Sequence, residues 1–357
     1  MVLKQFILFL VTVVIVDACS RLIYRFAHKF PQITGGVQYV EFLRGKGENF
    51  TGPIETRPYS LYWNRPNYSR KGFQQTDANG FRYKGYDVIL TKSKARVLCY
   101  GGSTTYSDHV LKNPEDCWPH RLEDKFRENN VEVEVINCGL NYGLTSELLS
   151  HFIFEGLHFN PDMIILHGPG NDTLPIATGD SSFDYRKTRK SLNLKPRFFE
   201  PALFRISGFS RLIYARALRE TVLVELEPEI WPAAEVQNQR LMNSEQFSFQ
   251  NNVNIFADIC ISRGIKLVLV DFVQNLPGEL ERMRPGLSVG MVEAVSRMNL
   301  FFASVAQSSP EKVLHVSFPP NYFDASDFVD LCHLNLVGEV KKSEYIFNEI
   351  RRFAISN

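Results

Sequence analysis

The stretch RVLCYGGS, residues 96–103, combines a short apolar strand with a glycine turn that ends in a serine. A second stretch, DMIILHGPGN (residues 162–171), is apolar after its first residue, as a strand buried on both faces should be. Between them the pattern predicts helices over residues 117–129 and 145–157 and a strand over residues 131–136. Strands that alternate with helices form parallel β-α-β units. The sequence therefore predicts an α/β protein with a doubly wound, three-layer α/β/α sandwich.

The same alternation returns in the C-terminal third of the chain. Helices are predicted over residues 246–263 and 291–306, and strands over residues 266–272 and 313–316. A closing helix is predicted over residues 336–353. This part supplies the remaining strands of the parallel sheet.

Three regions do not follow the alternation. Residues 1–20 are interpreted as a signal peptide or membrane anchor, and residues 21–94 as an irregular extension with a few short strands. Within the main domain, residues 95–357, an insertion at about residues 174–242 is interpreted as a surface lid with a helix around residues 210–218. Its basic run (residues 186–197) is expected to be a solvated face.

Composition excludes several classes of protein. With 357 residues, 44% hydrophobic and 22% charged, the chain can bury a sizeable core and is not disordered. Forty Lys+Arg against 39 Asp+Glu leave no basic excess, so no nucleic-acid partner is expected. The six cysteines form no C-x-x-C pair, so neither a structural metal nor a disulfide scaffold is expected.

The N-terminus carries an uncharged apolar run over residues 6–16. Because a membrane span needs about 20 apolar residues, this run suits a signal-peptide core better. Cleavage after Ala18 would leave Cys19 first, whereas an uncleaved anchor would reach about Ser20; a buried core helix is the third alternative. We expect membrane contact through this segment and an anchored or exported, extracytoplasmic protein.

Polar residues follow each predicted strand, where the ligand crevice of such sheets lies. Ser103 follows the first strand and Asn171 the third. After the second strand, Gly139 or Gly143 can offer a backbone N–H. Each feature alone is equally typical of an ordinary turn or a backbone cap.

Before the closing helix, Asp330 and His333 stand three residues apart. This spacing lets the carboxylate hold the imidazole Nδ1–H and leaves the other ring nitrogen as a general base. The rival nucleophile is Cys332, but adjacent side chains usually diverge, so we expect Cys332 to be a packing residue. The other histidines show no comparable spacing.

Taken in order, these blocks resemble the SGNH (GDSL-like) hydrolases, including their membrane-anchored or exported bacterial members. The resemblance covers residues 95–355 and implies the family's mostly parallel, flavodoxin-like sheet. It assigns the catalytic triad to Ser103, His333 and Asp330. It assigns the oxyanion hole to Ser103, Gly143 and Asn171, with Gly139 as the alternative glycine. Gly102 departs from the pattern, because it replaces the aspartate of Gly-Asp-Ser.

The resemblance implies a serine esterase that needs no cofactor and no metal. Its expected substrate is a small-molecule or glycan ester, such as an O-acetyl group on an extracytoplasmic glycan. Two alternatives stay open: an acyltransferase that moves the acyl group to a sugar hydroxyl, and a non-catalytic glycan-binding module that keeps the fold. The sequence leaves the oligomeric state open.

Overall fold

The computed structural model describes residues 2–27, 53–70, 73–107, 113–168, 170–179, 207–210, 212–213 and 232–355. The chain divides into two compact units. The helix unit comprises residues 1–53 and 190–230, and the sheet unit comprises residues 54–189 and 231–357. Each unit is described by itself.

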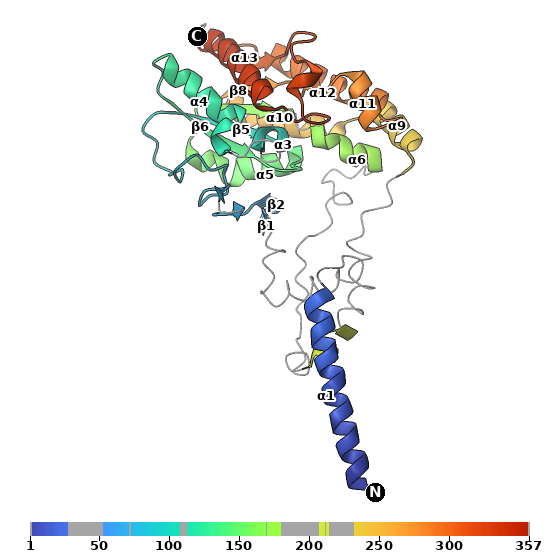
Figure 1. The fold of residues 1–357 in the computed structure, drawn as a ribbon. Coiled ribbons are helices and arrows are strands. Elements are labelled where there is room, and N and C mark those ends of the chain that lie inside the picture. Colours follow the sequence, from blue (N-terminus) through green and yellow to red (C-terminus); the bar gives the residue numbers. More distant parts are fainter. Residues whose placement is uncertain are drawn as a thin grey trace. The chain divides into compact units, whose positions relative to one another are not determined.

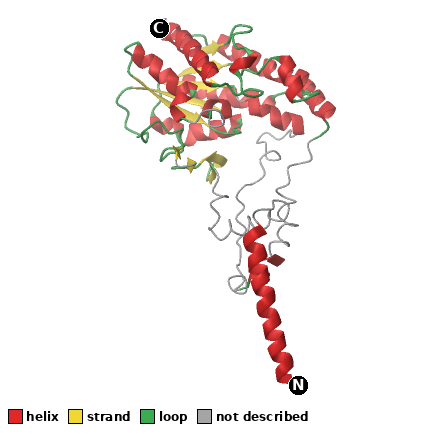
Figure 2. Ribbon diagram, viewed as in Figure 1, coloured by secondary structure: helices red, strands yellow, loops and turns green. Residues whose placement is uncertain are grey.

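The sheet unit is built on five parallel strands in the order β6-β5-β7-β8-β9. Helices surround this sheet (Figures 1 and 2). In chain order the strands are β5 (Ala95–Gly101), β6 (Val133–Gly139), β7 (Met163–His167), β8 (Lys266–Val270) and β9 (Val313–Val316). The first of these strands, β5, lies inside the sheet, and the next, β6, forms one edge. The strands β7, β8 and β9 then follow in order on the other side of β5. The predicted parallel, flavodoxin-like sheet is confirmed.

Helices cover both faces of the sheet, because successive strand residues point to opposite faces. Val97 and Cys99 of β5 enter a core with α4 (Trp118–Glu128) and α13 (Leu336–Ile355). Leu98 and Tyr100 enter the other core, which contains side chains of three helices: α5 (Thr145–Phe154), α10 (Phe247–Ser262) and α12 (Ser288–Ser308). Both faces are therefore buried and the three-layer sandwich is confirmed.

Several boundaries differ from the sequence-based prediction. Strand β6 runs to Gly139, because Asn137, Cys138 and Gly139 continue its ladder with β5. Helix α5 stops at Phe154 and is followed by the 3-10 helix η3 (Gly156–Phe159). Four short helices among the described residues were not predicted: α3 (Ser103–Tyr106), α6 (Thr173–Thr178), α9 (Ala234–Asn243) and α11 (Pro277–Met283).

Residues 54–94 belong to the sheet unit rather than standing apart from it. They form two hairpins, β1 (Ile54–Arg57) with β2 (Ser60–Asn64) and β3 (Ser69–Arg70) with β4 (Phe73–Gln74). Trp63 of β2 is fully buried and stacks on His151 of α5, with ring centroids 3.7 Å apart. An aromatic contact of this kind contributes beyond its buried area, and it attaches the hairpins to the sheet's helical layer.

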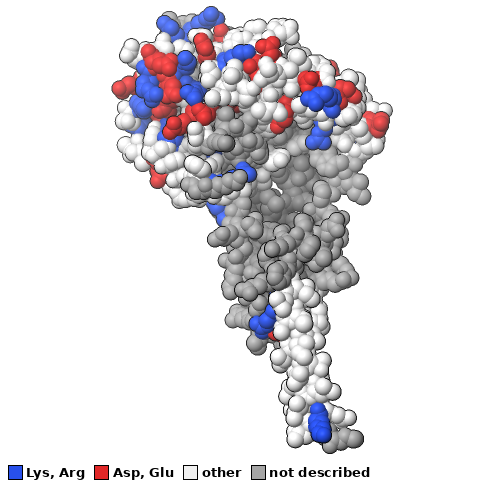
Figure 3. Space-filling model, viewed as in Figure 1, with Lys and Arg blue, Asp and Glu red and all other residues white. Residues whose placement is uncertain are grey.

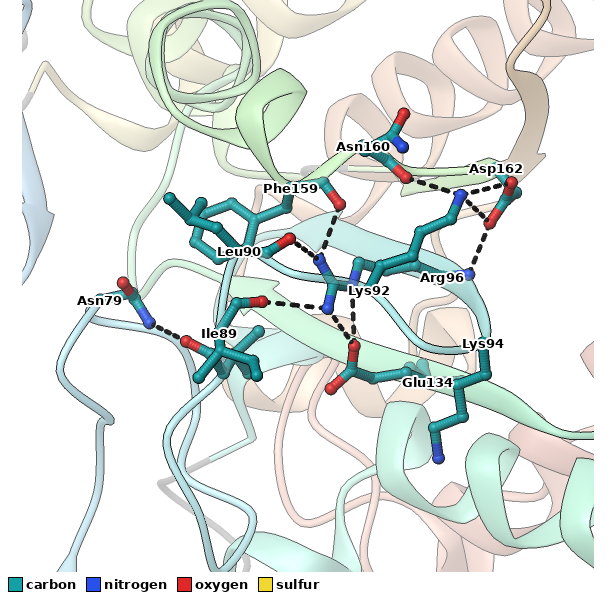
Figure 4. Close-up of polar contacts among 12 residues, drawn as sticks. Asn79, Ile89, Leu90, Lys92, Lys94, Arg96, Glu134, Phe159, Asn160 and Asp162 are labelled. Atoms are coloured by element: carbon teal, nitrogen blue, oxygen red, sulfur yellow. Dashed lines mark hydrogen bonds and ion pairs between the residues drawn. The ribbon is translucent and has the colours of Figure 1, made fainter.

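A buried arginine joins this N-terminal part to the beginning of the sheet (Figure 4). Arg96, only 1% exposed, donates from Nε to Glu134 at 2.7 Å. Its other guanidinium nitrogens donate to the carbonyl oxygens of Ile89, Leu90 and Phe159 at 2.8–3.2 Å. All of these hydrogen-bond partners of Arg96 are protein groups, and a buried charge needs such partners.

The helix unit contains α1 (Val2–Ala27), whose apolar part, Leu3–Ile23, is 21 residues long and includes an 18-residue window with a mean hydropathy of 2.3. That length is enough to cross a membrane, although a signal sequence meets the same criterion. The apolar side chains of its central part are exposed, and the few charged ones lie toward its two ends (Figure 3). α12 is also apolar enough, but its buried side chains lie in the sheet unit's core.

Three predictions fall largely outside the described residues. They concern the irregular segment over residues 28–52, the basic run over residues 186–197 and most of the helix around residues 210–218. Just before that helix, Ser207 is described and donates a hydrogen bond to Asp17 of α1 at 2.8 Å. That contact assigns this part of the insertion to the helix unit.

Candidate active site

A serine, a histidine and an aspartate from opposite ends of the sequence form one chain of hydrogen bonds. Ser103 begins the short helix α3 (Ser103–Tyr106) directly after β5, and its Oγ lies 2.8 Å from His333 Nε2. His333 Nδ1 lies 2.8 Å from Asp330 Oδ2. Since an ionised carboxylate can only accept, Nδ1 carries the proton and Nε2 offers its lone pair to the serine hydroxyl. The arrangement can therefore take a proton from Ser103.

The loop before α13 fixes the aspartate in place. Asp330 Oδ1 accepts the backbone N–H of Cys332 at 3.0 Å and that of His333 at 2.8 Å. Burial alone would raise the pKa of Asp330, but these bonds and the one from the imidazole lower it to about 2. Burial opposes protonation of His333, yet its bonds to Asp330 and Cys332 raise its pKa above the usual 6.5. Both shifts favour a carboxylate that stabilises an imidazolium.

Asn171 lies in η4 (Gly170–Asp172), the turn after β7, and its side chain lies close to Gly102, the residue before Ser103. Its Nδ2 donates to Gly143 O at 3.2 Å. A Cβ added to Gly102 would lie only 2.8 Å from this Nδ2. Gly102 thus provides the space that the Asn171 amide needs beside the serine, which gives a physical reason for the departure from Gly-Asp-Ser.

The two candidate glycines are placed differently from each other. The N–H of Gly143 donates to Leu140 O at 2.8 Å, within the turn that precedes α5. Gly139 lies inside β6, where its N–H donates to Asn137 Oδ1 at 2.8 Å. The carbonyl oxygen of Gly143 therefore contacts Asn171, while the N–H of Gly143 is bonded within the turn.

A buried glutamate supports the helix that carries Ser103. Glu339 of α13 accepts the hydroxyl of Ser107 at 3.2 Å and the N–H of Trp118 at 2.7 Å. The N–H of Ser107 donates to Ser103 O at 2.7 Å, at the C-terminal end of α3. Burial raises the pKa of Glu339, and Lys342 on the next turn counteracts this. The sequence offered no sign of this support, because Glu339 and Ser107 are 232 residues apart.

A second set of polar contacts links α13 to α3. Lys342 Nζ lies 2.9 Å from His167 Nε2, and His167 Nδ1 lies 2.9 Å from Thr105 Oγ1. Because the ammonium can only donate, Nε2 accepts and the Nδ1 proton goes to Thr105. Burial keeps the pKa of His167 well below its usual value, so this histidine is neutral.

The loop after β7 is tied to the start of α5. Asp172 accepts the hydroxyl of Thr145 at 2.6 Å and its N–H at 3.0 Å. Asn252 of α10 donates to the same hydroxyl at 3.0 Å. Thr145 therefore connects three elements, and Asp172 orients the turn that presents Asn171.

One sequence-based expectation about the side chains near the site is wrong. Cys332 and His333 do not diverge, since Cys332 Sγ lies 3.9 Å from His333 Nδ1. Cys332 is also partly exposed, unlike a packing residue. The loop geometry turns both side chains to the same side, although Sγ faces Nδ1 and not the serine.

His315 has a carboxylate partner that sequence spacing does not reveal. Its Nε2 lies 2.7 Å from Asp271 Oδ1, a residue 44 positions earlier at the end of β8. Asp271 also lines a cavity of about 210 Å³ with Phe272, Asn321 and Tyr322. This cavity lies among the loops after β8 and β9, at the carboxyl edge of the sheet.

No protein-family model and no curated protein matches this chain. Solved structures do match. TesA is 13% identical, with a TM-score of 0.41 over 72% of this chain and 99% of that one. The lipase/acylhydrolase from Enterococcus faecalis is 15% identical, with a TM-score of 0.42 over 72% and 95%. A mutant of Axe2, an acetyl-xylooligosaccharide esterase from Geobacillus, is 11% identical, with a TM-score of 0.43 over 73% and 96%. At these low identities, the activity of this chain has to be argued from its own residues.

Proposed function

We propose that this protein is a serine ester hydrolase of the SGNH type. The observation that carries the proposal is the continuous chain from Ser103 Oγ through the His333 ring to Asp330, with 2.8 Å at each step. A nucleophile, a base within hydrogen-bond reach and a group that orients the base are the parts that acyl transfer needs. The position of Ser103 at the carboxyl end of β5 supports the same conclusion.

The mechanism follows from these roles. His333 Nε2 takes the hydroxyl proton while Ser103 Oγ attacks the ester carbonyl, and Asp330 stabilises the imidazolium that forms. The N–H of Ser103 and the amide of Asn171 face the oxyanion of the tetrahedral intermediate. Gly143 adds a third donor when its N–H leaves Leu140 O. His333 then protonates the departing alcohol, and water resolves the acyl-enzyme by the same route in reverse.

The substrate proposed is an ester of a small molecule or glycan, such as an O-acetyl group on an extracytoplasmic polysaccharide. Two features support it. The apolar α1 supplies a signal or anchor for an extracytoplasmic location. The loop after β8, which contacts Asp330 O through Asn275, and the loop after β9 present amide, carboxylate and aromatic side chains, which suit a hydroxylated alcohol component.

The test uses the full chain purified in detergent, with p-nitrophenyl acetate as substrate. Ser103→Ala should reduce the rate by about 10⁴–10⁶ and abolish covalent labelling by a fluorophosphonate. The matched control is Ser304→Ala, an exposed serine on α12, which should keep full activity and labelling. Labelling that persists in Ser103→Ala would reject this nucleophile.

A sugar acceptor separates hydrolysis from transfer. With an excess of an oligosaccharide in the same assay, an esterase releases acetate, whereas a transferase forms an acetylated sugar at the expense of acetate. Acetate release that is unchanged by the acceptor supports hydrolysis. Sugar binding without release or transfer in the wild type would favour the non-catalytic module.

A further inference from the structure

A thiol, an imidazole and a carboxylate come together on four consecutive residues beside the nucleophile. The ligand atoms of Asp330, Cys332 and His333 all lie within 4.8 Å of one another. Thiolate, imidazole and carboxylate are the three ligand types that zinc takes in proteins. The mechanism proposed above uses two of these residues and gives the thiol no role.

We propose that Asp330, Cys332 and His333 form a binding site for a zinc-type divalent cation, and that occupancy of this site switches the enzyme off. Binding itself rests on the geometry of the three side chains. The inhibitory consequence rests on the proposed function, because it acts through the base.

The distances suit a tetrahedral ion. With Zn–S near 2.3 Å and Zn–N near 2.0–2.1 Å, the S···N edge of a tetrahedral site is about 3.6 Å, and the corresponding N···O edge is about 3.4 Å. In the structure Cys332 Sγ lies 3.9 Å from His333 Nδ1, and this nitrogen lies 2.8 Å from Asp330 Oδ2. Shifts of less than an ångström would bring these two edges to tetrahedral length, and the third, between Sγ and the carboxylate, starts within 4.8 Å. Solvent water supplies the fourth ligand, as in open zinc sites.

The site is accessible from solvent. The side chain of Asp330 is 47% exposed and that of His333 is 14% exposed. Cys332 is partly exposed, whereas four of the other five cysteines are buried and only Cys19, on α1, is open to solvent. An ion can therefore enter without disturbing the core.

Metal binding would disable the base through a tautomer change. The ion replaces the proton on Nδ1, which moves to Nε2, and the thiol releases one proton to solvent as Sγ becomes a thiolate ligand. No oxidation or reduction occurs. An imidazole with the proton on Nε2 can only donate toward Ser103, so it cannot accept the hydroxyl proton.

Binding is tested on the full chain with cobalt(II) as a spectroscopic substitute for zinc. The wild type should develop a near-ultraviolet thiolate-to-cobalt charge-transfer band that zinc abolishes by displacement. Cys332→Ser should lose this band, whereas Cys19→Ser, the matched exposed cysteine, should keep it. Absence of the band from the wild type, or its persistence in Cys332→Ser, would overturn the site.

Inhibition is tested separately with p-nitrophenyl acetate and buffered free zinc. Zinc should inhibit the wild type, a chelator should restore its rate, and Cys332→Ser should need at least about tenfold more zinc for half inhibition. Equal zinc sensitivity of the wild type and Cys332→Ser would overturn the switch. A cobalt band in a protein without esterase activity would support the metal site and reject the proposed function.

Discussion

The two ends of strand β5 carry polar networks built on different principles. At its beginning, Arg96 is 1% exposed, and its guanidinium reaches Glu134 and three carbonyl oxygens. At its end, Ser103 meets His333, whose partner Asp330 has a side chain 47% exposed. The first network is closed within the protein, whereas the second lies at an edge that solvent reaches.

This difference separates stability from reactivity. A buried charge whose contacts are all internal is costly to disturb and has nothing left to offer a ligand. A partly exposed pair in the loop before α13 contributes less to stability, but it can exchange protons with a substrate. Mutations at the reactive end should therefore change rate more than stability, and those at the closed end should do the reverse.

The largest expected effect is on rate at the reactive end. Asp330→Asn should lower kcat by up to about 10⁴, because an amide no longer fixes the Nδ1–H tautomer of His333. The midpoint of thermal unfolding should fall less than for a mutation at the closed end, because the Asp330 side chain is half exposed. Both are measured with p-nitrophenyl acetate and by circular dichroism. An unchanged kcat would remove Asp330 from the mechanism and leave a Ser103–His333 dyad.

At the closed end, Arg96→Met should reduce the free energy of unfolding by about 3–5 kcal/mol, since Glu134 loses its buried partner. The folded fraction should keep its specific activity. The matched control is Arg127→Met, an exposed arginine paired with Asp124 on α4, for which a change within about 1 kcal/mol is expected. Urea unfolding measures both. Equal losses would mean that burial does not distinguish these pairs.

Gly102→Ala should lower kcat by about 10²–10³, the usual effect of losing one oxyanion donor. The added methyl group would meet Asn171 Nδ2 and displace that amide, while KM should change much less. Gly278→Ala is the control, since a Cβ there meets no atom within 4 Å. If Gly102→Ala keeps full kcat, the Asn171 amide does not act on the transition state.

Local sequence pattern was sufficient for the fold and for the main parts of the candidate site. Short apolar runs that alternate with helical segments revealed the five strands, and glycine or asparagine directly after them indicated the carboxyl edge. Asp330 and His333 could be paired because both lie in one turn. The boundary of β6 was missed because its last residues, Asn137 and Gly139, are poor strand formers that the ladder with β5 holds in place.

Contacts between distant segments could not be predicted in this way. Glu339 with Ser107, Lys342 with His167, and Asp271 with His315 join residues 44 to 232 positions apart. No periodicity relates such residues, so only the packing of α13 and the order of the strands bring them together. The proximity of Cys332 Sγ to His333 was missed for a different reason, since it depends on the backbone of one loop.

The smallest expected effect is a displacement of the pH profile, which reports on the reactive end alone. Only neutral His333 can accept the serine proton, so kcat/KM should rise about tenfold per pH unit below its pKa and then level off. Because Asp330 raises that pKa above 6.5, the inflection should lie above 6.5 and fall toward it in Asp330→Asn.

The contribution of His333 to stability changes with pH in the opposite direction to activity. The raised pKa of His333 stabilises the fold fully below the unfolded value, and this contribution is lost as pH rises through the folded value. The lowered pKa of Asp330 stabilises the fold above 3.8 and ceases to do so as pH falls through about 2. The enzyme should therefore gain activity over the same interval in which the imidazolium–carboxylate pair stops contributing to stability. Measuring kcat/KM and the unfolding midpoint across this interval checks both signs, and an inflection at or below 6.5 in the wild type would show that Asp330 does not stabilise the imidazolium.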